Sequence, residues 1–123
     1  MKNTFTVFVF LACISFNSFA VNESELQDIA DCMAAVGITN VTMQMNGDYK
    51  NYKLGEKISS RLMDIFYDKL FELKKIKPSI DEAYLGQMPN RASAQYSRMN
   101  ELQQMKYAKS VMDTNNCFQY IRK

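Results

Sequence analysis

Three groups of side chains in this sequence could carry chemistry: the cysteines, the carboxylates and the methionines. The chain of 123 residues contains three cysteines and no histidine. Without an imidazole, the Ser-His-Asp and Cys-His arrangements, histidine zinc sites and an axial haem histidine are excluded. The sequence also lacks a Ser-x-x-Lys nucleophile, and its glycines are too far apart for a phosphate-binding loop. We therefore expect a protein that is not an enzyme and that holds no cofactor.

The carboxylates with the most suggestive spacing are Asp64, Asp68 and Glu72, which follow one another at intervals of four residues. On a helix this spacing lines them along one side, as a general acid/base pair or a hard-cation site would require. Arg61 and Lys69 lie within a turn of the same carboxylates, and such pairs are common on exposed helix faces. A solvated face is the favoured interpretation, and a small hydrolase is a remote alternative.

The methionines offer the sharpest metal hypothesis. Exported copper proteins bind Cu(I) through thioether sulfurs, and Met43 and Met45 form a Met-x-Met pair. Most other methionines fall at helical spacing among apolar residues, where methionine fills gaps in a core. Met43 and Met45 are thus the weak candidates for a metal site.

The first twenty residues predict a secretory signal peptide. Lys2 precedes an apolar run, and Ser18 and Ala20 place small residues three and one before a cleavage point. We expect segment 1–20 to be removed and segment 21–123 to form one mature domain in the periplasm or outside the cell. An uncleaved anchor and a lipidated Cys13 are the alternatives.

Removal of the leader leaves two cysteines, Cys32 and Cys117. An even pair in an exported chain most often forms a disulfide, because the compartment is oxidising. The bond would close a loop of 85 residues, for which the chain-entropy model gives at most about 4.6 kcal/mol. We expect this disulfide to supply a large share of the stability of a small domain.

The charge of the mature domain is almost balanced, with fourteen basic and thirteen acidic side chains once Lys2 is gone. This balance argues against nucleic-acid binding, which needs a concentrated basic excess. We also expect no stable membrane span after leader removal. Segment 21–49 contains five acidic side chains and no basic one, whereas segment 50–77 contains eight basic and four acidic ones, so the first helix should lie beside the second. The acids of the first helix would be the groups that titrate in an acid-stress chaperone: Glu23, Glu25, Asp28 and Asp31.

Helical periodicity dominates the mature chain and predicts an all-α fold, a bundle of four or five helices stapled by Cys32–Cys117. The Ser24 to Gln27 spacing indicates a capping box, and Gly37 indicates the end of that helix. Segment 38–45 is expected to be an irregular connection, because no second strand exists to pair with it. The other expected elements are a long helix at 52–77 ended by Pro78, a short helix capped by Ser79 and closed by Gly86, a turn at 88–90, a helix at 92–112 and a terminal helix near 117–121.

The tyrosines give the best indication of a contact surface. Tyr49 and Tyr52 are predicted to lie in the polar connection before the long helix, beside Asp48 and Lys53. Exposed tyrosines with polar neighbours are typical of interface anchors. We take Asp48, Tyr49, Tyr52 and Lys53 as the candidate partner-binding residues.

By size, leader and single long-range disulfide, the chain resembles small periplasmic immunity and inhibitor proteins, an analogy of architecture that carries no residue with it. It implies an exported binding protein that blocks a protein partner such as a cell-wall hydrolase or a toxin effector. A periplasmic acid-stress chaperone and a methionine-based copper-binding protein are the alternatives, and a homodimer is left open.

Overall fold

The computed structural model describes residues 22–121, and every regular element in this part of the chain is helical. The expected all-α fold with one disulfide is confirmed. The predicted signal peptide, its predicted cleavage after Ala20 and the alternative at Cys13 lie outside the described residues. The elements in chain order are α2 (Glu23–Met45), α3 (Tyr49–Ile76), α4 (Glu82–Gly86), α5 (Met88–Ala94), the 3₁₀ helix η1 (Gln95–Arg98), α6 (Glu101–Thr114) and the 3₁₀ helix η2 (Cys117–Tyr120).

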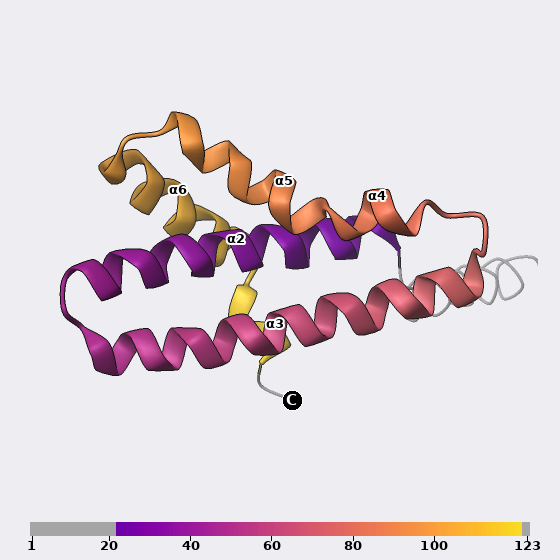
Figure 1. Ribbon diagram of the computed structural model, residues 1–123, viewed down its shortest axis with the longest axis horizontal. Coiled ribbons are helices and arrows are strands. Elements are labelled where there is room, and N and C mark those ends of the chain that lie inside the picture. Colours follow the sequence, from indigo (N-terminus) through magenta and orange to yellow (C-terminus); the bar gives the residue numbers. More distant parts are fainter. Residues whose placement is uncertain (1–21, 122–123) are drawn as a thin grey trace, which may run out of the picture.

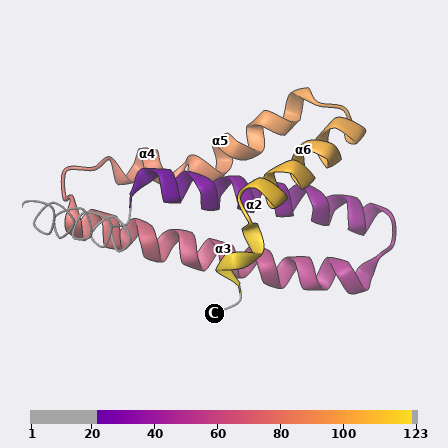
Figure 2. The ribbon, with the colours of Figure 1, turned by 180° about the vertical axis from the view of Figure 1, so that it is seen from behind.

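Helix α2 is the central element of the bundle. It runs antiparallel to α3 on one side, and α5 and α6 cover its other side (Figure 1). The final segment η2 leaves α6 and crosses α2 toward α3, which is clearest from behind (Figure 2). One helix therefore contacts nearly every other long element, and its buried residues lie on more than one face.

The start of α2 differs from the sequence expectation. The cap is Asn22, whose side chain accepts a hydrogen bond from the backbone N–H of Glu25 at 2.9 Å, so the predicted capping box at Ser24 is wrong. Asn is as good a helix cap as Ser, and it lies two residues nearer the leader.

The end of α2 was also predicted wrongly. The helix continues through Gly37 to Met45, so segment 38–45 is helical and not an irregular connection. A glycine within a helix costs about 1 kcal/mol relative to alanine. Packing outweighs that cost, because Val36 and Asn40, on either side of Gly37, are both buried.

Helix α3 confirms the strongest sequence pattern, although it begins three residues earlier than expected. Asp48 caps it by accepting from the backbone N–H of Asn51, and the helix ends before Pro78. Its buried side chains Leu62, Phe66 and Leu70 continue along the face toward α2. Residues Leu54 and Ile76 from the same apolar pattern are exposed.

The second half of the chain contains three further differences. The cap of α4 is Asp81 and not Ser79. Segment 88–90, which was expected to be a turn, is the start of α5. Proline is tolerated at Pro89 because backbone N–H groups in the first turn of a helix have no partner within the helix. The single helix expected at 92–112 is divided, since Met99 is extended and Asn100 forms a capping box with Gln103.

The core has three parts with different chemistry. Large side chains fill the contact between the first half of α2, the second half of α3 and α4. Small side chains dominate where α5 and α6 cover α2, and there Tyr96 is the one large buried residue. Its hydroxyl has no hydrogen-bond partner among the described residues, and burial raises the pKa of Tyr96 to about 12. The third part contains the disulfide with Val36 and Leu62.

The disulfide joins the middle of α2 to η2. Cys32 and Cys117 are both fully buried, and their Cα atoms lie 5.5 Å apart. The left-handed backbone of Asn116, with φ of 47°, turns the chain out of α6 so that Cys117 reaches α2. Asparagine tolerates this conformation better than most residues. The expected pairing is confirmed.

Removal of the disulfide should lower stability without changing the helical content of the folded state. We expect the Cys32→Ala/Cys117→Ala variant to lose roughly 2 to 4.6 kcal/mol of unfolding free energy, because the unfolded chain regains the entropy of the open loop. Urea titration followed by circular dichroism measures this loss. Reductant should lower the urea midpoint of the wild-type protein to that of the variant, and it should leave the midpoint of the variant unchanged. An equal urea midpoint for oxidised wild type and variant would contradict the role assigned to the bond.

A close contact between α2 and α3 gives a second prediction. A Cβ atom at Gly55 would overlap the side-chain amide of Asn40, whose Nδ2 donates to Ser59 Oγ at 3.3 Å. Gly55→Ala should therefore destabilise the protein by roughly 1 to 2 kcal/mol, because the buried amide must move and lose this bond. The loss is measured by urea unfolding.

Two controls make this test specific. Gly37→Ala, at a helical glycine with no atom within 4 Å of the added Cβ, should stabilise the protein by roughly 0.5 to 1 kcal/mol. The double variant Asn40→Ala/Gly55→Ala should be more stable than Gly55→Ala alone, because the overlap is gone. Equal effects of Gly55→Ala and Gly37→Ala would show that the close contact is unimportant.

Candidate functional site

The candidate binding residues lie at the end of the molecule where α2 turns into α3. Gly47 adopts a φ of 77°, which only glycine adopts readily, and the backbone N–H of Asp48 donates to the Met43 carbonyl at 2.9 Å. Asp48 also holds the side chain of Asn51, with Nδ2 donating to Oδ2 at 2.8 Å. The turn is therefore short and closed by its own hydrogen bonds.

The structure corrects the predicted setting of the tyrosines. Of the four candidates, only Asp48 belongs to the connection, while Tyr49, Tyr52 and Lys53 lie in the first two turns of α3. Tyr49 is 64% exposed, whereas Tyr52 is half-buried. The neighbouring Glu56 carboxylate raises the pKa of the Tyr52 phenol. Tyr49 is thus the more accessible of the two aromatic side chains.

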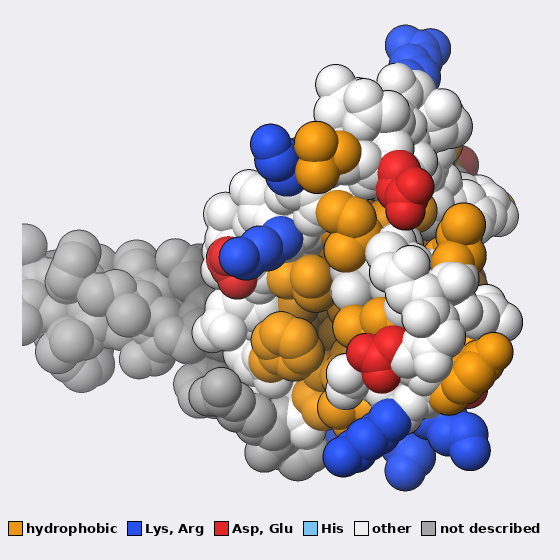
Figure 3. Space-filling model, turned by 90° about the vertical axis from the view of Figure 1, so that its left-hand side faces the viewer, with side chains coloured by type: hydrophobic (Ala, Val, Ile, Leu, Met, Phe, Trp, Pro, Cys, Tyr) orange, Lys and Arg blue, Asp and Glu red, His pale blue; other side chains and the backbone are white. Residues whose placement is uncertain are grey.

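Sequence reasoning missed the apolar side chains that accompany Tyr49. Val41 and Met45 are 52% and 74% exposed, and one helical turn separates them on the same face of α2. Leu54 of α3 is 57% exposed. Viewed from this end, hydrophobic side chains gather around a hollow (Figure 3). We call Val41, Met45, Tyr49 and Leu54 the hairpin-end surface.

The spacing of Val41 and Met45 was visible in the sequence, but it became meaningful only with a helical α2. An irregular connection places no particular residues on a common face. Val41 and Met45 continue the face of α2 that packs against α5 and α6. On this face, Ala34 is buried and Ile38 is partly buried. Toward the turn into α3, the α5–α6 pair diverges from α2 (Figure 1), and Val41 and Met45 are exposed.

Basic side chains lie on α3 beside the hairpin-end surface. Lys50, Lys53 and Lys57 are exposed on α3, and none of them forms an ion pair with a described residue. Lysine and arginine side chains gather at the lower edge of the view in Figure 3. Asp48 and Glu56 are the acidic groups near them in the sequence, so this end combines apolar contact area with a surplus of positive charge.

The two methionines proposed for copper do not converge. Residues two apart on a helix point in different directions, so Met43 and Met45 cannot chelate one ion from the same face. Met43 is half-buried against a cavity, and Met45 is mostly exposed. Within the described residues, no group of three or more Cys, Asp or Glu side chains is arranged to hold a metal ion. Asp64, Asp68 and Glu72 are exposed on the outer face of α3.

The acidic side chains of α2 have separate surroundings. Glu25 of α2 forms an ion pair with Lys69 of α3, with 2.7 Å between Oε1 and Nζ. This pair joins the two helices, which the charge pattern predicted to lie side by side. This is the only ion pair within the described part of the chain. Asp31 faces the other side, where burial raises the pKa of its carboxyl, a hydrogen bond from Gln27 Nε2 at 3.0 Å lowers it, and Asp28 raises it.

Comparisons with protein-family models, with curated proteins and with solved structures find no match for this chain. Among the described helices, none has both the length and the apolar character needed to cross a membrane.

The raised pKa of Asp31 predicts a pH effect with a definite sign. A carboxyl that binds its proton more tightly in the folded state costs stability when it ionises, so the cost is absent below the usual value of 3.8 and complete above the folded pKa. Asp31→Asn keeps an acceptor for Gln27 and removes the charge. We expect the variant to melt at a higher temperature than wild type at pH 7, with the difference shrinking toward pH 3. A difference that grows at low pH would contradict this assignment.

Proposed function

We propose that the protein is an exported binding protein that docks a protein partner through its hairpin-end surface. The single observation that supports this proposal is the exposure of Val41, Met45, Tyr49 and Leu54 at one end of a disulfide-locked bundle. Gathered exposed apolar side chains often mark interaction sites, whereas scattered ones need no explanation. Tyrosine and methionine are both enriched in protein interfaces.

The charge around this surface indicates the chemistry of the partner. Lys50, Lys53 and Lys57 stand beside the apolar residues without ion-pair partners among the described residues. An acidic rim on the partner would speed association and orient the two proteins, while the apolar centre would supply most of the affinity. We therefore infer a partner with an acidic surface around an apolar depression or cleft.

The proposed role is inhibition or immunity in the periplasm or outside the cell. The disulfide is compatible with an oxidising compartment, and the predicted leader supplies the route to it. An end that presents an exposed aromatic side chain beside basic groups is suited to block the cleft of a cell-wall hydrolase or a toxin effector. No step of this role requires the protein itself to catalyse a reaction.

A capture experiment with a matched pair of variants tests the proposal. Oxidised tagged protein is used to isolate a stoichiometric partner from an envelope extract and from secreted effectors, and affinity is then measured by calorimetry. Tyr49→Ala should weaken binding by at least tenfold, because the partner loses an anchor side chain. Phe71→Ala removes a similarly exposed aromatic residue of α3 near its other end, and it should leave affinity unchanged.

Two results would overturn the proposal. Equal affinities of the Tyr49→Ala and Phe71→Ala variants would place the contact elsewhere. A partner whose activity is unaffected at saturating protein would exclude inhibition, even if binding is tight.

A further inference from the structure

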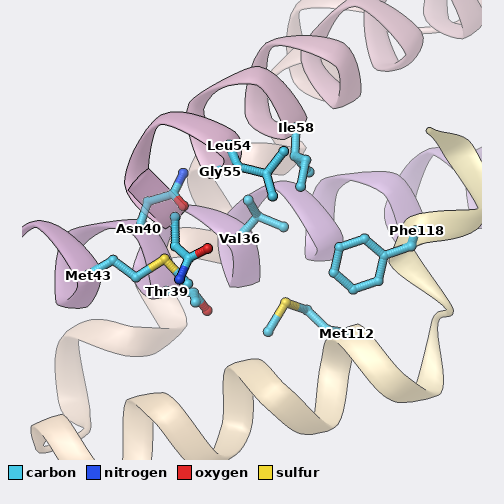
Figure 4. Close-up of a pocket in the computed structure, with 10 residues that line it drawn as sticks. Val36, Thr39, Asn40, Met43, Leu54, Gly55, Ile58, Met112 and Phe118 are labelled. Carbon is cyan, nitrogen blue, oxygen red and sulfur yellow. The ribbon is translucent and has the colours of Figure 1, made fainter. Parts of the chain in front are cut away.

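A cavity of about 150 Å³ lies on the side of the α2–α3 pair that faces α6 and η2 (Figure 4). The α2–α3 pair and the C-terminal elements α6 and η2 form its walls. The apolar side chains that line it are Val36 and Met43 from α2, Leu54 and Ile58 from α3, Met112 from α6 and Phe118 from η2. Leu54 and Phe118 are half-exposed at its edge, so the cavity communicates with the surface.

The polar side chains of the lining already use their donors within the protein. Thr39 Oγ1 donates to the Ala35 carbonyl at 2.9 Å, and Asn40 Nδ2 donates to Ser59 Oγ at 3.3 Å. The amide of Asn51 is held by Asp48. No ionisable side chain lines the cavity. A charged ligand would therefore meet no counter-ion, and a polar ligand would lose more hydrogen bonds with water than it gains.

The walls are held in place by two constraints. The disulfide fixes η2 against α2, which positions Phe118 at the cavity. The close approach of Asn40 to Gly55 sets the separation of α2 and α3 beside it. The positions of α2, α3 and η2 that form the cavity are therefore set by the disulfide and by this helix contact. Largely preformed apolar sites of this kind bind ligands without a large reorganisation.

From its volume and lining, we propose that this cavity binds an uncharged, compact apolar molecule of the size of a single aromatic ring. An enclosed apolar cavity of about 150 Å³ binds benzene. The present cavity matches it in volume and in apolar lining, although it is open at Leu54 and Phe118. Sulfur contacts with aromatic rings are favourable, and both Met43 and Met112 offer them here. This site shares Leu54 with the hairpin-end surface, but the variants that test the two sites differ, so either proposal can fail without the other.

The protein contains its own reporters for the test. The oxidised protein is labelled with ¹³C at the methionine methyl groups and titrated with benzene. The methyl signals of Met43 and Met112 should shift and saturate, because a bound ring lies beside them. Met45 and Met63 are exposed and do not line the cavity, so their signals should remain unchanged.

A matched pair of variants separates the cavity from general binding. Met43→Phe fills the cavity and should reduce the benzene shift of Met112 at least fivefold. Met45→Phe adds the same ring two residues away on the exposed face and should leave that shift unchanged. Should Met43→Phe fail to fold by circular dichroism, Met112→Phe with the Met43 signal as reporter replaces it. Absence of a saturable shift at Met43 and Met112, or equal shifts at all four methionines, would overturn the proposal.

Discussion

The bond between Cys32 and Cys117 is the constraint on which the arrangement of the second half of the chain depends. The α5–α6 pair covers α2 largely through alanines, and each alanine buries little apolar area. The large fully buried side chains lie between α2 and α3 instead, among them Phe66, Leu26 and Ile29. Hydrophobic burial thus stabilises the α2–α3 pair more than it stabilises the covering helices. The disulfide offsets this difference because it holds the end of the chain on the middle of α2.

The two halves of the α2–α3 pair differ in the quality of their packing. Where α3 ends, Phe66, Leu70 and Leu73 pack on α2, and the Glu25–Lys69 ion pair joins the helices. Toward the turn, the contact passes through Gly55 and the amide of Asn40, and the cavity opens beside it. Binding surfaces are commonly drawn from the less stable parts of a fold. Surface apolar residues and an open cavity at the same end agree with that tendency.

The sequence allowed the fold class, the disulfide and α3 to be predicted, because each depended on local pattern or on cysteine count. The apolar periodicity of α3 was a reliable guide because its buried face packs on α2, so local pattern and tertiary contacts favour the same helix. Gly37 misled the prediction of α2, because a glycine stops a helix only where the following residues have no helical contacts to make. The break at Met99 was hidden by apolar spacing that continues across it, although the Asn100 to Gln103 capping box marked it.

The candidate residues were predicted to lie beside the turn, but their structural surroundings were not predicted correctly. Tyr49 and Asp48 do lie at the exposed end of the hairpin, yet the polar loop expected around them is a three-residue turn between two helices. This difference changes the chemistry of the site. A helical α2 brings Val41 and Met45 to one face beside the turn and sends Met43 to the opposite side, toward Met112 and Phe118. The same helical geometry that separates the two methionines as copper ligands therefore creates two apolar features, an outer surface suited to a protein and an inner cavity suited to a small molecule.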